Sequence, residues 1–292
     1  TYGYEVPQQR AQEVLKRFFQ GPVNMLDTSR NYAMGESEKR IGMAIKENGG
    51  WPEKFVLSTK IDRNMDTLVL DKKRTRESVE ESLKALNVDS VDVLFLHDPE
   101  YVKDINDVTK KDGALDELFK IKEEGLAKAV GLAMGRIDIM FPILRKWDFD
   151  VIINHNRDTL LNREADEMYS YAHSKNISIF NAAPYAGGVL AKGPSNFKKI
   201  TYQDATEEKL APAREIEKVC KKYNVEMGAA ALQFSMKDKR ITSTICGVTS
   251  VQSIEKNISW AETDIPEEFW NEVLKLPYST KDPESERTYT PG

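Results

Sequence analysis

The chain has 292 residues, 40% of them hydrophobic and 30% charged, so it is long and apolar enough to bury one large core. Its formal net charge of -5 argues against a nucleic-acid partner, and no apolar run reaches the roughly 18 residues that cross a membrane. Two cysteines, Cys220 and Cys246, form no Cys-x-x-Cys motif. We therefore expect reduced thiols, no metal site, no charged-then-apolar leader and a soluble cytoplasmic protein.

The chain alternates between two kinds of apolar pattern. A first helix is predicted from Pro7 to Gln20, where apolar residues recur at helical spacing until Gly21-Pro22. Short β-branched runs then predict strands at 23–26, 55–60, 91–97, 126–132, 151–154, 177–181 and 242–246. Helices are predicted at 36–47, 75–86, 114–124, 137–146, 164–175, 211–223, 227–237, 250–259 and 266–276.

Strands separated by helices of this length are typical of βαβ units. We therefore predict an α/β fold, a (β/α)8 TIM barrel of one domain over residues 1–292. The count gives seven strands, so we expect the eighth, the first of the barrel, to precede Thr1. A glycine- and lysine-rich loop at 186–209 interrupts the alternation, and we expect the polar tail at about 279–292 to be mobile.

Three successive predicted strands end on side chains that can do chemistry. Asp27, Lys60 and His97 stand at the carboxyl ends of these strands, and Tyr32 lies in the loop after the first. In a (β/α) barrel, catalytic groups gather at that face. The plainer interpretation is an Asp27–Lys60 salt bridge with an unrelated tyrosine and histidine.

These residue types suit hydride transfer between a nicotinamide and a carbonyl or alcohol carbon, in which a proton must move to or from the oxygen. A phenol with a pKa of about 10 is a poor base near neutrality. The Lys60 ammonium would favour the phenolate of Tyr32, Asp27 would hold the lysine charged and in place, and a neutral His97 would orient the substrate oxygen.

The order of these four residues resembles the catalytic tetrad of the aldo-keto reductases. Leu26-Asp-Thr-Ser and Gly35-x-Ser-Glu resemble the N-terminal motif of that family, and the similarity continues to about Asn257. The resemblance implies an NAD(P)-dependent oxidoreductase acting on a small sugar or carbonyl compound, with Tyr32, Lys60, Asp27 and His97 as its catalytic residues.

Three segments, 94–100, 154–162 and 181–188, are similar to the branch of the family that contains D-threo-aldose and L-fucose 1-dehydrogenases. That branch implies oxidation of the anomeric hydroxyl of an aldose to its lactone. Two alternatives stay open: an NADPH-dependent reductase of aldehydes or ketones, and a nucleotide-binding regulatory subunit of the same fold.

The cofactor positions implied by the resemblance depart from the family's usual residues. Ala133-Met134 replaces a Ser-Asn pair, His155 replaces a Gln, and Ala182 stands where many members stack a Tyr on the nicotinamide. The implied cofactor-binding set is His155, Ala182, Ala183, Pro184, Tyr185, Gly187, Gly247, Thr249, Ser253 and Asn257. Within it, Tyr185 is either a rim residue or plain packing, and Asn257 matches the adenine-binding Asn.

The adenosine end bears on the choice between NAD and NADP. A Lys and an Arg bind the 2'-phosphate in members that prefer NADPH, and those positions align here with Gly247 and Ser253. Loss of two cations removes the charge-assisted bonds that distinguish a phosphate from a hydroxyl. We therefore expect NAD or dual use.

Overall fold

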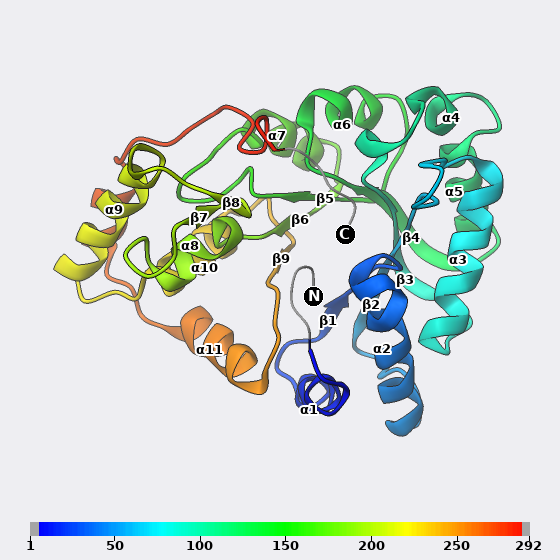
Figure 1. Cartoon of the computed structure of the whole chain (residues 1–292), viewed down its shortest axis with the longest axis horizontal. Helices are drawn as coiled ribbons and strands as arrows, with labels where there is room; N and C mark the ends of the chain where they lie inside the picture. The colour runs from blue at the N-terminus through cyan, green and yellow to red at the C-terminus, as the bar shows by residue number, and fades with distance from the viewer. Residues whose placement is uncertain (1–5, 288–292) are drawn as a thin grey trace. The chain divides into compact units, whose positions relative to one another are not determined.

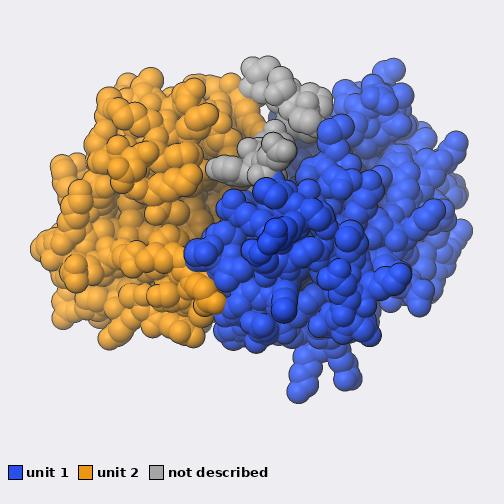
Figure 2. All heavy atoms as spheres, turned by 60° about the horizontal axis from the view of Figure 1, so that its bottom comes forward, with its two compact units in different colours: residues 1–152, 248–254, 291–292 blue, residues 153–247, 255–290 orange. Residues whose placement is uncertain are grey.

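The computed structural model describes residues 6–287, and most of its helices and strands are labelled in Figure 1. The chain divides into two compact units, shown in two colours in Figure 2. Among the described residues, unit 1 takes 6–152 and 248–254, and unit 2 takes 153–247 and 255–287. Organisation as one domain stays a prediction, and the expected strand before Thr1 lies outside the described residues.

Four parallel strands run through unit 1 in chain order. They are β1 (Met25–Asp27), β2 (Val56–Ile61), β3 (Val91–His97) and β4 (Ala127–Ala133). The strands predicted at 55–60, 91–97 and 126–132 are confirmed to within one residue, whereas the first strand is shorter than predicted. Because parallel strands end at the same edge of a sheet, Asp27, Lys60 and His97 come to one edge.

The helices of unit 1 are largely those that the sequence predicts. They are α1 (Gln8–Phe18), α2 (Glu36–Glu47), α3 (Lys72–Leu86), α5 (Ala114–Glu123) and α6 (Ile137–Leu144), with an unpredicted α4 (Ile105–Thr109). Helices α2, α3 and α5 pack in succession (Figure 1). Helix α3 begins earlier than predicted because the Asp71 side chain accepts a hydrogen bond from the Arg74 N–H and caps it.

Helices α2 and α3 approach closely at Gly42. A Cβ atom at this position would lie 2.1 Å from the carbonyl oxygen of Ala85, so a larger residue would force the helices apart. The surrounding apolar side chains, among them Ile45, Val79 and Leu86, are buried. This packing fixes α2, which follows the Tyr32 loop directly.

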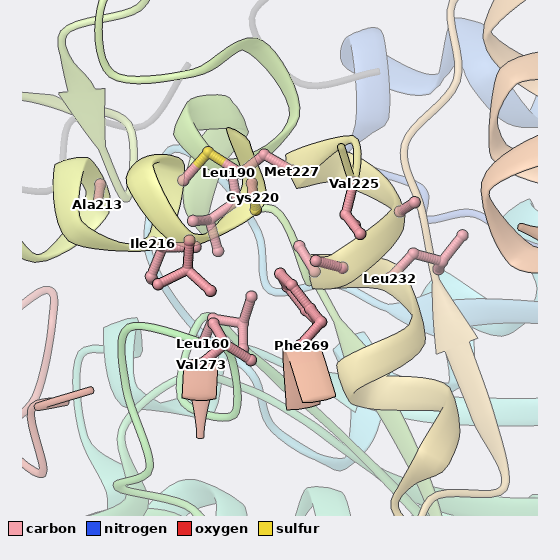
Figure 3. Packing of buried hydrophobic residues seen from close by; sticks show 14 of the residues in the cluster. Leu160, Leu190, Ala213, Ile216, Cys220, Val225, Met227, Leu232, Phe269 and Val273 are labelled. Carbon is pink, nitrogen blue, oxygen red and sulfur yellow. The ribbon is translucent and has the colours of Figure 1, made fainter. Parts of the chain in front are cut away.

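Unit 2 contains most of β5 (Val151–His155), followed in the sheet by β6 (Ser178–Ala182) and β9 (Ser243–Ile245). Its helices are α7 (Asp166–Ser174), α9 (Glu207–Lys222), α10 (Met227–Lys237) and α12 (Glu267–Val273). Helix α11 (Val251–Glu262) begins in unit 1 and continues into unit 2. Figure 3 shows the core of unit 2, where Ile216, Leu232 and Phe269 pack together.

Two expectations for unit 2 were wrong. Residues 186–209 are no plain loop, because they form the turn η3 (Ala186–Gly188), helix α8 (Val189–Lys192) and the antiparallel pair β7 (Lys199–Ile200) and β8 (Gln203–Asp204). The described part of the tail, 279–287, is held by hydrogen bonds rather than mobile. Ser279 donates to the Leu161 carbonyl at 2.9 Å and accepts from the Arg163 N–H at 2.8 Å. Within residues 6–287, no helix combines the length and apolar character needed to span a membrane.

Candidate active site

Lys60 and Asp27 form a buried ion pair across β2 and β1. Lys60 Nζ lies 2.6 Å from Asp27 Oδ2 and 2.6 Å from the Thr28 carbonyl oxygen, and Ser58 Oγ donates to Asp27 Oδ1 at 2.8 Å. The side chains are 2% and 6% exposed. Burial alone would lower the pKa of Lys60, but Asp27 and Tyr32 outweigh it and raise that pKa. The lysine is therefore a fixed ammonium.

Tyr32 begins the short turn η1 (Tyr32–Gly35), which places its ring beside this ammonium. Lys60 Nζ lies 4.7 Å from the centroid of the Tyr32 ring. Ala33 and Met34 both have positive φ angles, of 51° and 54°, and Gly35 continues the left-handed turn at 88°. Such a run is strained for side-chain-bearing residues and is kept only where the surroundings enforce it.

Burial raises the pKa of Tyr32 to about 12, although the nearby Lys60 ammonium lowers it. Desolvation disfavours the phenolate more than the single cation favours it, since Asp27 partly cancels the lysine charge. The cation thus acts in the expected direction, but the phenol is the resting form at neutral pH.

His97 lies at the end of β3 and edge-on to Tyr32, with ring centroids 6.0 Å apart. Its Nδ1 is 2.6 Å from Asp62 Oδ1 and 3.3 Å from Ser29 Oγ, and its Nε2 is 3.7 Å from Asp98 Oδ2. Burial would lower the pKa of His97, but Asp98 and Asp62 outweigh it and raise that pKa. We expected a neutral imidazole, whereas these surroundings favour the imidazolium.

The structure thus brings Asp27, Tyr32, Lys60 and His97 together within unit 1. The sequence assigned no role to Asp62, the closest partner of His97. A signal was present, because residues i and i+2 of a strand face the same side, which places Asp62 beside Lys60 at the end of β2. The catalytic roles of the four residues Asp27, Tyr32, Lys60 and His97 are a proposal.

Several of the predicted cofactor residues have hydrogen-bond partners within unit 2. His155 Nε2 lies 3.1 Å from Glu284 Oε2, and Tyr185 donates to Asn257 Oδ1 at 2.7 Å. Tyr185 is therefore not plain packing alone, since its hydroxyl reaches the residue expected to bind adenine. The Ala183 N–H donates a hydrogen bond to the carbonyl oxygen of Ile245, in β9, at 3.2 Å.

The remaining predicted positions stand in turns. Ala182 ends β6, Pro184 and Gly187 lie in the turn that follows, and Gly247 comes directly after β9. In unit 1, Ser250 Oγ accepts from the Ser253 N–H at 3.1 Å and caps α11, and Ser253 Oγ accepts in return from the N–H groups of Thr249 and Ser250 at 3.2 and 3.1 Å.

The residues present fit a nicotinamide dinucleotide. A Cβ at Gly247 would have no neighbour within 4 Å, and the buried Oδ1 of Asn156 has no hydrogen-bond partner among the described residues. Between residues 247 and 257 the only lysine or arginine is Lys256, whose Nζ is 2.8 Å from Glu226 Oε1. A cation committed to a carboxylate is a poor phosphate ligand.

Parallel strands alternating with helices, with a buried lysine and aspartate beside a tyrosine and a histidine, define the class of protein as an NAD(P)-dependent oxidoreductase. The chain belongs to the aldo/keto reductase family, whose family model matches residues 1–276. Within residues 6–287, no cluster of three or more His, Cys, Asp or Glu could hold a metal ion.

Two similar proteins are sugar dehydrogenases by name. The chain is 28% identical over 271 residues to L-galactose dehydrogenase of Arabidopsis thaliana, covering 87% of this chain and 78% of the relative. It is 28% identical over 288 residues to D-threo-aldose 1-dehydrogenase of a Pseudomonas species, covering 90% of this chain and 86% of the relative.

The holo structure of an aldo-keto reductase from Bacillus halodurans is similar in fold. Its TM-score is 0.78 at 19% identity, covering 97% of this chain and 92% of that one. The predicted α/β class, with the strand and helix alternation of a (β/α)8 barrel, is confirmed.

Proposed function

We propose that this protein oxidises the anomeric hydroxyl of an aldose ring to the lactone, using NAD or, with less preference, NADP. The observation that supports the chemistry is the buried Lys60–Asp27 pair beside the Tyr32 ring, with His97 edge-on to that ring. The substrate class follows the names of the two relatives, which are both dehydrogenases of sugars.

In this reaction two bonds break at the anomeric centre. The C1–H bond breaks and its electron pair leaves as hydride, while the O–H proton passes to the phenolate oxygen of Tyr32, so that C1 and oxygen become a carbonyl. The bound nicotinamide supplies the hydride acceptor. Lys60 stabilises the phenolate, Asp27 holds Lys60, and His97 hydrogen-bonds the substrate oxygen.

Polar side chains at the end of β5 are consistent with a hydroxyl-rich substrate. His155 and Arg157 are paired there with Glu284, and the buried Oδ1 of Asn156 has no hydrogen-bond partner among the described residues, whereas a site for a steroid would present aromatic surface. A site built to hydrogen-bond hydroxyls rejects analogues that lack them. We therefore expect deoxygenated analogues to be much poorer substrates.

For the cofactor, we propose contacts from the backbone of residues 182–188, His155 at the nicotinamide end and Asn257 at the adenine. The pairing of Lys256 with Glu226 supports NAD over NADP. Cytoplasmic localisation stays a prediction of the sequence.

The test is to incubate the protein with NAD or NADP and L-galactose, L-fucose, D-arabinose and related aldoses, and to follow NADH at 340 nm and the lactone by mass. Tyr32→Phe is the matched control, because it lacks only the hydroxyl oxygen. Turnover of at least one aldose supports the proposal. Failure on every aldose, with efficient NADPH-dependent reduction of simple aldehydes, would favour a general carbonyl reductase.

A further inference from the structure

We infer that Asp62 is a positioning residue for His97, which keeps both ring nitrogens protonated so that Nε2–H donates a charge-assisted hydrogen bond to the substrate oxygen. The inference rests on the proposed function for the identity of that oxygen. The state of the ring itself can be measured without any substrate.

Asp62 is a buried carboxylate with a full set of donors. It is 1% exposed, and its Oδ2 accepts from Ser29 Oγ at 2.6 Å and from the Asn31 N–H at 2.9 Å. Its Oδ1 lies 2.6 Å from His97 Nδ1. Burial would raise the pKa of Asp62, but His97, Ser29 and Asn31 lower it. Asp62 is therefore ionised.

An ionised carboxylate can only accept hydrogen bonds, so the proton between Asp62 and His97 resides on Nδ1. A neutral ring would then have a bare lone pair at Nε2 and could not donate to the substrate oxygen. Only the imidazolium has N–H groups on both nitrogens. The position of Asp62 thus makes donation from Nε2 depend on a charged ring.

Other charged groups also surround the His97 ring. From the segment after β3, Asp98 Oδ2 lies 3.7 Å from Nε2, too far for a hydrogen bond but near enough to favour the cation. The Lys60 ammonium of β2 opposes the cation. Tyr32 faces the ring edge-on as a neutral phenol. The two carboxylates outweigh the one cation, and the pKa of His97 rises.

Asp62→Asn separates orientation from charge. The Asn31 N–H needs an acceptor, so the amide oxygen takes the Oδ2 position and the amide nitrogen faces Nδ1. His97 would then accept at Nδ1 and carry its single proton on Nε2. The variant keeps a donor at Nε2 but removes its positive charge.

The direct experiment uses protein labelled with ¹⁵N in its three histidines, with His97 assigned through His97→Gln. In the wild type we expect both His97 nitrogens to stay protonated above about pH 6.5, the ordinary histidine pKa. In Asp62→Asn we expect a lower His97 pKa and no proton on Nδ1 at pH 7. The exposed Asp66→Asn on the same segment is the control and should leave His97 unchanged.

A kinetic arm uses whichever aldose or aldehyde the enzyme turns over. Charge-assisted hydrogen bonds are roughly twice as strong as neutral ones, so Asp62→Asn should lower kcat about tenfold with KM within a few-fold. A wild-type His97 that is neutral at pH 7, or one whose titration Asp62→Asn does not move, would overturn the inference. If only the aldose assignment proves wrong, the ¹⁵N measurement still tests the role of Asp62.

Discussion

At the scale of single residues, the site depends on how Lys60 is held. Its Nζ touches Asp27 Oδ2 and the Thr28 carbonyl oxygen, both at 2.6 Å, so the ammonium has little freedom to leave the Tyr32 ring. Burial strengthens these contacts because little water screens them. A rigid cation beside the phenol is what the proposed proton transfer needs.

Tyr32→Phe should therefore remove nearly all turnover, a loss of at least about a hundredfold in kcat. The hydroxyl that carries the proton is lost while the ring remains, so affinity for the cofactor should stay within a few-fold. Steady-state kinetics and titration of NADH fluorescence measure the two effects. Retention of more than about a tenth of wild-type kcat would refute the role assigned to the hydroxyl.

The pH dependence follows from the pKa of Tyr32, which burial raises to about 12. Oxidation needs the phenolate, whose population rises about tenfold per pH unit below that pKa. We therefore expect kcat/KM for oxidation to climb with pH over the range 7 to 10. Reduction needs the phenol, which is fully populated there, and should show no such rise. Equal profiles in both directions would contradict the assignment.

The sequence predicts Asp27, Lys60 and His97 because each ends a recognisable strand. It does not predict Asp62 as a partner of His97, since these residues are 35 positions apart and meet only through the pairing of β2 with β3. The placement of the Tyr32 ring beside Lys60 was also beyond the sequence, because it depends on the left-handed η1 turn.

At the scale of helices and strands, periodicity recovers the elements that have a continuous apolar face. It misses α4 (Ile105–Thr109) and α8 (Val189–Lys192), which are too short to show a period of 3.6 residues. Helix α8 nevertheless forms, because Val189 and Leu190 are fully buried in the core of unit 2. Tertiary burial rather than local propensity determines such short elements.

Gly42→Ala tests the packing of α2 on α3. The new methyl would lie 2.1 Å from the Ala85 carbonyl oxygen, and one of the helices must shift. Overpacking of this kind costs about 1–3 kcal/mol of unfolding free energy, which outweighs the gain in helix propensity. Urea unfolding followed by circular dichroism measures it, with Lys46→Ala on the exposed face of α2 as the control. A stability equal to that of the control would contradict the close approach.

The N-terminal turn of α11 provides a test of cofactor choice. Ser253 satisfies the N–H groups of Thr249 and Ser250. We propose that Gly247 and Ser253 occupy the positions at which the family places its phosphate-binding cations. We expect kcat/KM for NAD to equal or exceed that for NADP. Gly247→Lys combined with Ser253→Arg should shift the ratio toward NADP. A wild-type preference for NADP above about 100-fold, roughly 2.7 kcal/mol, would mean that another cation binds the phosphate.

At the scale of the whole chain, the tail returns to residues far away in the sequence. Glu284 lies 3.1 Å from both His155 Nε2 and Arg157 Nη1, and its side chain is 5% exposed. The sequence suggests mobility for this segment because it is polar. Its order comes from ion pairs with residues about 120 to 130 positions earlier in the chain. A local sequence pattern cannot predict partners so far away.

These ion pairs should make the free energy of unfolding depend on pH. Burial would raise the pKa of Glu284, but His155, Arg157 and Arg287 lower it to about 2 from 4.5. A carboxylate with a lowered pKa stabilises the fold above its unfolded pKa and loses that effect as the pH falls through its folded pKa. Glu284→Gln should therefore cost about 2–3 kcal/mol of unfolding free energy near pH 6 and almost nothing near pH 2.

Urea midpoints measured between pH 2 and pH 7 give this difference directly. Glu286→Gln is the matched control, since Glu286 is exposed and its pairing with Lys209 lies at the surface. A constant difference between wild type and Glu284→Gln over the whole range would show that the carboxylate has an ordinary pKa in the folded protein.

The buried pairing of Asp27 with Lys60 also limits which substitutions these two positions can accept. Replacement of either residue alone leaves the other charge buried without its partner, which costs about 3–5 kcal/mol. Few proteins have that much stability in reserve. We therefore expect relatives that have lost hydride transfer either to keep both residues or to replace both. Related sequences should show correlated substitution at these two positions, even where the tyrosine has been lost.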